Sequence, residues 1–164
     1  MSSNKPRGEG KVNNNNNSLH NKILLVDDEP DITTVFALGL EDHGFKVDVF
    51  NDPLQALSDF KKGSYDLVLI DYKMPNMNGF ELHREIRKID EKVKVCFITA
   101  FEVYYDELKK KFQNSLNASS RQQHRQEEDV KCFIQKPIDI DELIKRIKHE
   151  LNLKQLASKH HRIL

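Results

Sequence analysis

Five polar side chains stand where short apolar runs of the sequence end. They are Asp27, Asp28, Asp71, Thr99 and Lys136. Three carboxylates held together repel one another, so a proton or a cation has to neutralise them. Magnesium prefers oxygen ligands and fits such a cluster, whereas zinc fits poorly because no cysteine or histidine stands near these aspartates in the sequence. The pattern therefore predicts a Mg²⁺ site.

The same residues can support phosphoryl transfer. An aspartate carboxylate can attack phosphorus and carry the phosphoryl group as an acyl phosphate, and we expect Asp71 to be that nucleophile. Such a transfer depends mainly on positioning and on neutralising charge. We expect Lys136 and Mg²⁺ to neutralise the phosphoryl oxygens, and Thr99 to donate a hydrogen bond to one of them.

Alternating strands and helices must position these residues. The expected strands are 22–26, 46–50, 67–70, 93–99 and 132–134, and helices are expected from about residues 30, 53, 78, 103 and 140. Five such alternations predict a parallel α/β sheet with helices on both faces and right-handed crossovers. All carboxyl ends of parallel strands share one edge, where ligands of open α/β sheets bind. The five polar side chains should therefore meet.

Apolar residues at helical spacing predict the faces that the helices turn toward the sheet. The predicted inward residues are Ile32, Val35, Phe36, Leu40, Leu54, Leu57, Phe60, Leu82, Ile86, Ile89, Leu143, Ile144, Ile147 and Leu151. After Asp71, the turn residues Pro75 and Gly79 lead the chain into a helix, and Pro137 follows Lys136 in a further turn.

Composition narrows the function. Lys and Arg number 26 and Asp and Glu number 26, so the formal net charge is zero, which argues against direct binding of nucleic acid. No apolar run is long enough to cross a membrane, and the N-terminus lacks the apolar core of a signal peptide. We therefore expect a cytoplasmic protein without membrane partners. Cys96 and Cys132 lie in apolar runs, which favours buried reduced thiols over a disulfide or metal pair.

Four motifs in this order resemble the receiver domain of two-component response regulators. They are Val26-Asp27-Asp28, Asp71 with Met74-Pro75 and Gly79, Thr99-Ala100, and Lys136-Pro137. The resemblance covers residues 22 to 151 and implies a flavodoxin-like, doubly wound, five-stranded parallel sheet in the order 2-1-3-4-5. The implied organisation is a disordered Asn-rich segment over 1–21, a receiver domain over 22–153 and a polar tail over 154–164.

The resemblance also implies roles for individual residues. Asp71 would be the phosphoacceptor, and Asp27, Asp28 and the backbone carbonyl of Lys73 would hold Mg²⁺ with it. Thr99, Ala100 and Lys136 would bind the phosphoryl group. Thr99 and Phe133 would form the switch that alters a partner-binding face.

Partners follow from the same resemblance. A histidine kinase or phosphotransfer protein would donate the phosphoryl group. A downstream protein, which the sequence does not identify, would receive the signal. The resemblance is also compatible with a dimer that forms on phosphorylation. The protein would catalyse only its own phosphorylation and dephosphorylation. No output domain follows in the sequence, so we expect a stand-alone receiver. A polar insertion over about 114–128, longer than the family pattern, is predicted to border the output face.

Three other interpretations are weaker or remain open. A flavodoxin-like cofactor binder is disfavoured because the acidic run Asp27-Asp28-Glu29 would repel a phosphate. An aspartate-nucleophile phosphatase resembles the pattern Asp-x-Asp, but Lys73 occupies the place of its second acid. A receiver-like scaffold that is never phosphorylated remains an alternative.

Overall fold

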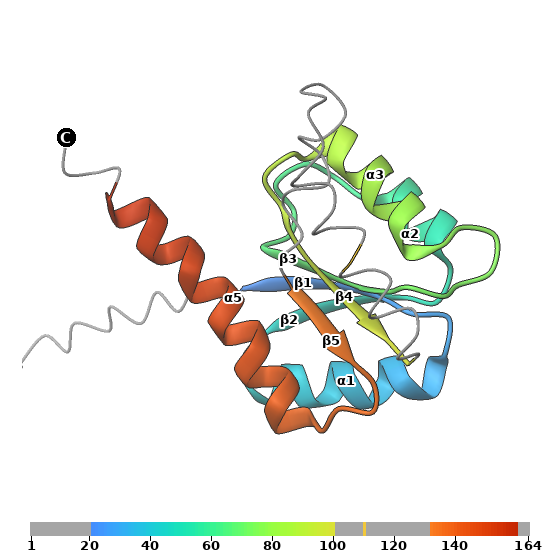
Figure 1. Ribbon diagram of the computed structural model, residues 1–164, viewed down its shortest axis with the longest axis horizontal. Coiled ribbons are helices and arrows are strands. Elements are labelled where there is room, and N and C mark those ends of the chain that lie inside the picture. Colours follow the sequence, from blue (N-terminus) through green and yellow to red (C-terminus); the bar gives the residue numbers. More distant parts are fainter. Residues whose placement is uncertain (1–20, 101–109, 111–131, 161–164) are drawn as a thin grey trace, which may run out of the picture.

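The chain forms a five-stranded parallel sheet in the order β2-β1-β3-β4-β5 (Figure 1). This computed structural model describes residues 21–100, 110 and 132–160. The elements are β1 (Lys22–Val26), α1 (Pro30–Asp42), β2 (Lys46–Phe50), α2 (Pro53–Asp59), β3 (Leu67–Asp71), α3 (Gly79–Ile89), β4 (Lys94–Thr99), β5 (Cys132–Gln135) and α5 (Ile140–His160). The predicted fold class and strand order are confirmed.

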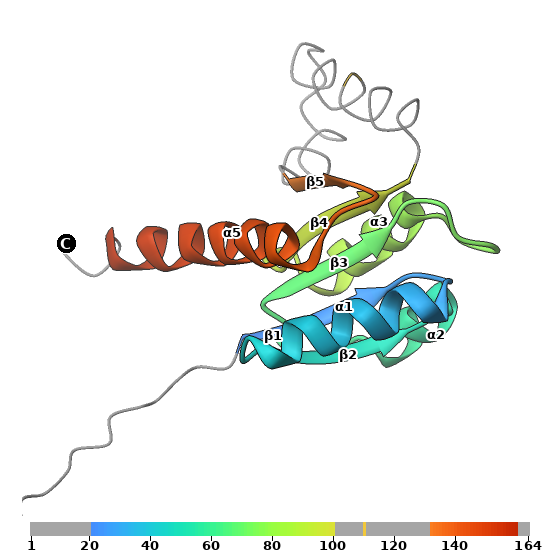
Figure 2. The same cartoon turned by 90° about the horizontal axis from the view of Figure 1, so that it is seen from below.

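Helices cover both faces of the sheet. Figures 1 and 2 show α1 and α5 on one side and α2 and α3 on the other. The strands alternate between two apolar clusters, so that Leu25, Leu69 and Ile98 pack with α1 and α5 while Val26, Ile70 and Phe97 pack toward α2 and α3. Each fully buried aliphatic side chain stabilises the fold by about 1.5–3 kcal/mol. The central strands are therefore rigid supports for residues at their carboxyl ends.

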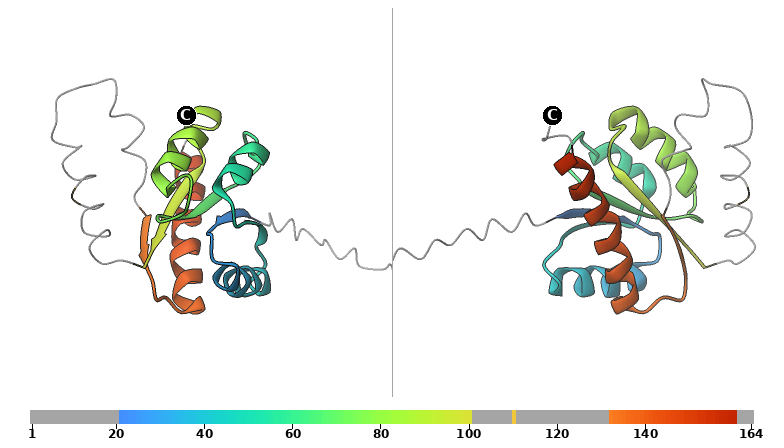
Figure 3. Two further views of the ribbon diagram at one scale, coloured as in Figure 1. Left: turned by 90° about the vertical axis from the view of Figure 1, so that its right-hand side faces the viewer. Right: turned by 60° about the vertical axis from the view of Figure 1, so that its left-hand side comes forward.

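Close packing joins the two helices of the α1/α5 face, which Figure 3 shows from two sides. A Cβ atom added to Gly39 of α1 would collide with the side chain of Ile140, the first residue of α5. Leu143 and Ile147 of α5 are fully buried. The glycine thus allows α5 to lie against α1 as well as against the sheet.

Nine of the fourteen predicted inward residues are buried, Ile32 and Leu57 are half-buried, and three are exposed. Val35 is 60% exposed, Leu54 is 49% exposed and Ile89 is 37% exposed. In α1 the sheet-facing side is set by residues three and four apart, so Thr33 takes the inward place and Val35 points outward. In α2, which ends at Asp59, the buried positions are Pro53 and Ala56.

The two cysteines contradict the prediction of reduced thiols. Cys96 of β4 lies directly opposite Cys132 of β5 in the strand register, with Cα atoms 4.5 Å apart, and the two form a disulfide. This separation lies within the range that a disulfide can bridge. The sequence placed each cysteine in a buried strand but did not fix the register between strands 36 residues apart.

Some predictions concern residues outside the described ranges. These are the disordered segment predicted over 1–21, except for residue 21, the helix expected from about residue 103 and the insertion over about 114–128. At the C-terminal end, α5 continues to His160, past the predicted domain boundary at residue 153. Within the described ranges, no helix combines the length and the apolar character needed to cross a membrane.

Candidate functional site

Three carboxylates meet at the carboxyl edge of the sheet. Asp71 is the last residue of β3, and Asp27 and Asp28 follow β1, its hydrogen-bonded neighbour. Carboxylate oxygens of all three lie within 4.8 Å of one another. Asp27 is 1% exposed and Asp71 is 6% exposed, and Asp28 is half-buried. The structure therefore brings together the acids that the sequence singled out.

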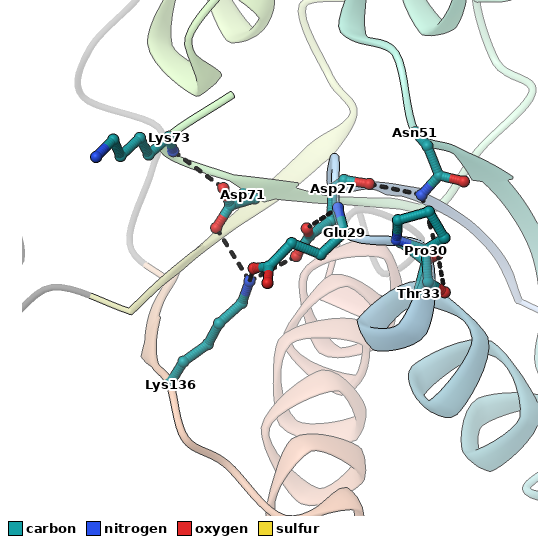
Figure 4. Close-up of polar contacts among 8 residues, drawn as sticks. All are labelled: Asp27, Glu29, Pro30, Thr33, Asn51, Asp71, Lys73 and Lys136. Atoms are coloured by element: carbon teal, nitrogen blue, oxygen red, sulfur yellow. Dashed lines mark hydrogen bonds and ion pairs between the residues drawn. The ribbon is translucent and has the colours of Figure 1, made fainter. Parts of the chain in front are cut away.

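Lys136 reaches into this cluster from the loop after β5 (Figure 4). Its Nζ lies 2.6 Å from Asp27 Oδ2 and 3.2 Å from Asp71 Oδ1, and the residue is 7% exposed. Its backbone N–H donates to the carbonyl of Thr99 at 2.8 Å, which ties the loop to the end of β4. The Lys136–Pro137 peptide bond is cis. A buried ammonium thus bridges two buried carboxylates from different strands.

The charges in the cluster are not fully balanced. Burial raises the pKa of Asp71 to about 6, with Lys136 opposing this rise and Asp27 and Asp28 adding to it. Burial alone would lower the pKa of Lys136, but Asp27 and Asp71 outweigh it and raise that pKa. The lysine therefore stays charged, while burial and the neighbouring acids disfavour the ionised form of Asp71.

The β3–α3 loop holds Asp71 from the other side. The Lys73 N–H donates to Asp71 Oδ2 at 3.0 Å, and Figure 4 shows the Lys73 side chain extending away from Asp71. The Gly79 N–H donates to the carbonyl of Tyr72 at 2.9 Å. A Cβ atom on Gly79 would lie 2.5 Å from the backbone oxygen of Asp71, so only glycine allows α3 to begin this close to β3. Asn78 caps α3 through a capping box with Glu81.

The remaining predicted residues surround the same edge. A cleft of about 440 Å³ is lined by Asp28, Glu29, Asp71, Lys73, Met74, Pro75 and Ala100. Thr99, at the end of β4, is 1% exposed. Phe133 lies further back on β5, is 8% exposed, and stacks on Phe97 with ring centroids 5.7 Å apart. In this conformation the predicted switch ring is therefore already buried.

Sequence reasoning missed two residues beside the acids. Glu29 Oε1 lies 3.5 Å from Lys136 Nζ, and its own N–H donates to Asp27 Oδ1 at 2.9 Å. Asn51 donates from Nδ2 to the backbone carbonyl of Asp27 at 2.7 Å. Asn51 directly follows β2, so the strand-end reasoning that selected the other residues, applied to this strand, would have found it.

Comparisons with known proteins identify the family of this chain. A family model for the response regulator receiver domain matches residues 23–148. The chain is 32% identical over 136 residues to sporulation initiation phosphotransferase F of Bacillus subtilis, covering 83% of this chain and 98% of that protein. It is 32% identical over 127 residues to the response regulator ArlR of Staphylococcus saprophyticus, covering 77% of this chain and 50% of that protein. The chain thus spans about half the length of ArlR and of several other curated relatives.

A solved structure extends the comparison to the fold. The response regulator protein TrrA of Thermotoga maritima, in complex with Mg²⁺-BeF, matches with a TM-score of 0.62 at 29% identity, covering 79% of this chain and 98% of that chain. One assignment agrees with the motifs, the strand order, the acid cluster with its buried lysine and the family match. The chain belongs to the response regulator receiver domain family of two-component phosphorelay systems.

Proposed function

We propose that Asp71 accepts a phosphoryl group, in a Mg²⁺-dependent reaction, from a phosphohistidine of a histidine kinase or phosphotransfer protein. The observation that supports this most strongly is the buried Lys136 ammonium, 2.6 Å from Asp27 and 3.2 Å from Asp71. A buried lysine beside Asp71, which lines the cleft, is suited to receive the oxygens of an incoming anion. The match to a receiver solved with Mg²⁺-BeF supports the same function.

The donor set fits a divalent, oxygen-preferring cation. When ionised, the carboxylates of Asp27, Asp28 and Asp71 together with the Lys136 ammonium carry a net charge of −2. Carboxylates and a backbone carbonyl are ligands that Mg²⁺ takes, and the Lys73 carbonyl would complete the protein's share. Bound there, the ion would supply charge neutralisation for the phosphoryl oxygens. The raised pKa of Asp71 supports this fit, because burial, with Asp27 and Asp28 adding to it, disfavours the ionised carboxylate and a cation would offset that cost.

In the proposed step, a carboxylate oxygen of Asp71 forms a bond to phosphorus as the phosphorus–nitrogen bond of the phosphohistidine breaks. The electron pair of that bond returns to the imidazole nitrogen, and an aspartyl phosphate results. The Lys73 N–H and Lys136 hold the carboxylate oriented before the attack, with N···O distances of 3.0 and 3.2 Å. Lys136, the Thr99 hydroxyl and the Ala100 backbone would then bind the new phosphoryl oxygens.

Output is the second part of the proposal. The phosphoryl group places about −1.5 to −2 charges next to Lys136, in exchange for the single charge of the Asp71 carboxylate, and such a change acts at a distance by biasing a two-state element. Thr99 and Phe133 are proposed as that element, changing a face that a downstream protein, or a second copy of the chain, would bind. We propose that the protein catalyses only its own phosphorylation and dephosphorylation. We also propose that it is located in the cytoplasm and does not contact nucleic acid directly.

Incubation with acetyl phosphate and Mg²⁺, followed by intact-mass measurement, tests the proposal. The wild type should gain the mass of one phosphoryl group, and the gain should disappear with a chelator or in Asp71→Asn. Asp66→Asn, at the opposite end of β3, is the matched control and should still be modified. No mass gain in the folded wild type would instead favour the scaffold that is never phosphorylated.

A further inference from the structure

The Asn51 side chain points toward Asp27, whose backbone it contacts (Figure 4). Its Nδ2 donates to the Asp27 carbonyl at 2.7 Å and to the Thr33 hydroxyl at 3.0 Å. Asn51 itself is exposed, but Asp27 is 1% and Thr33 is 2% exposed, so both acceptors are removed from solvent. Buried acceptors lose stabilisation when their donor is removed, because water replaces it poorly.

These two bonds fix the loop at both ends. At its start, the Asp27 N–H donates to the Phe50 carbonyl at 3.2 Å, so Phe50 and Asn51 together hold both backbone polar groups of Asp27. At its end, the Thr33 hydroxyl donates to the Pro30 carbonyl at 3.0 Å, which links Asn51 to the first turn of α1. Asp28 stands between the two fixed points.

We infer that Asn51 is a positioning residue for the divalent-cation site, setting where the carboxylates of Asp27 and Asp28 stand relative to Asp71. This inference rests on the metal site proposed above. Residues that hydrogen-bond to a metal-binding segment, without touching the metal, typically change metal affinity by about 10- to 100-fold when removed. Asn51 is such a residue, because its amide contacts Asp27 at the start of the acidic loop and Thr33 in the helix that follows.

A purely structural role for Asn51 makes a different prediction. If Asn51 only stabilised the loop or the start of α1, its loss would lower the unfolding midpoint and leave the Mg²⁺ affinity of the folded protein unchanged. The two roles are therefore separated by titrating Mg²⁺ into folded variants by isothermal titration calorimetry, with circular dichroism to verify folding.

Thr33 and Thr34 provide a matched pair of controls. Both hydroxyls donate to the Pro30 carbonyl, at 3.0 and 2.7 Å, but only the Thr33 hydroxyl accepts from Asn51 in the bonds described here. Asn51→Ala should weaken Mg²⁺ binding about 10- to 100-fold, Thr33→Val should weaken it in the same direction, and Thr34→Val should leave it unchanged. The Asn51→Ala/Thr33→Val double variant should lose less than the product of the single losses, because the two residues act through one contact.

A second measurement needs no metal. Amide hydrogen exchange at Asp28 and Glu29 in chelator should be faster in Asn51→Ala than in the wild type, while exchange in β3 should not change. A wild-type Mg²⁺ affinity in folded Asn51→Ala, or an equal loss in Thr34→Val, would overturn the inference while leaving the proposed function standing. A wild type that binds no Mg²⁺ would overturn the proposed function and this inference together.

Discussion

Replacing Asp71 by asparagine should stabilise the metal-free protein, although it removes a partner of Lys136. The pKa of Asp71 is about 6 in the folded protein against an ordinary 3.8, and each pKa unit corresponds to about 1.4 kcal/mol. Above pH 7, ionised Asp71 therefore lowers the free energy of unfolding by about 3 kcal/mol. Asparagine has nearly the shape of the protonated acid and avoids this cost. The attraction of Lys136 is already included, because it acts on the same pKa.

The pKa of Asp71 sets the pH range over which Asp71→Asn should be more stable than wild type. A raised pKa means that the folded state binds the proton more tightly than the unfolded state, so the contribution of Asp71 to stability is present below pH 3.8 and is lost as pH rises through 6. The difference between Asp71→Asn and wild type should therefore be small near pH 4 and reach its full size above pH 7. Urea unfolding in chelator across this range measures it.

Two further measurements make the expectation specific. Glu41→Gln makes the same change in net charge at an exposed position of α1 and should alter stability by no more than about 0.5 kcal/mol. Saturating Mg²⁺ should stabilise the wild type more than Asp71→Asn, because the variant lacks one of the three carboxylates. If Asp71→Asn is less stable than wild type at pH 8 in chelator, the ion pair with Lys136 outweighs burial and the reasoning is refuted.

Three other predictions concern the supports of the site and core. Gly79→Ala should lower the free energy of unfolding in urea by about 1–3 kcal/mol, because the added Cβ would collide with the backbone oxygen of Asp71. It should also slow phosphorylation by acetyl phosphate, and an unchanged rate would refute this prediction. Burial and Arg87 lower the pKa of His83 from 6.5 to about 4, so the contribution of His83 to stability should fall by about 3 kcal/mol as pH falls from 6.5 to 4. The difference between wild type and His83→Gln in urea titrations measures this contribution, and a difference that does not change with pH would refute it. Reducing the Cys96–Cys132 disulfide should lower the free energy of unfolding by about 4 kcal/mol, measured by urea unfolding with and without reductant. If protein denatured without reductant shows two reactive thiols, the disulfide is absent and the prediction is contradicted.

The strand ends were predictable because parallel topology forces them together. Once alternation of strands and helices was established, Asp27, Asp71 and Lys136 had to share one edge, whatever the details of packing. Their separations and the direction of each side chain were not predictable. Which acid Lys136 approaches most closely depends on the path of the loop after β5, and the structure gives that place to Asp27.

Contacts between side chains far apart in sequence were the main omissions. The disulfide requires the register of β4 against β5, and the Asn51 bonds require the register of β2 against β1, neither of which apolar runs specify. The outward positions of Val35 and Leu54 have a different cause. Periodicity identifies an apolar helix face only approximately when polar residues such as Thr33 are themselves buried through hydrogen bonds.

The same burial that disfavours ionised Asp71 would make the site sensitive to a bound cation or phosphoryl group. An exposed acid would be screened by water, and a cation or phosphoryl group would change its free energy little. At 6% exposure, with two further acids beside it, Asp71 responds strongly to any nearby charge. The rigid core strands hold this unfavourable arrangement in place, and Lys136 offsets only part of it. In such a site a bound cation would relieve the excess of negative charge, whereas phosphorylation would add to it, so we expect the two events to be coupled.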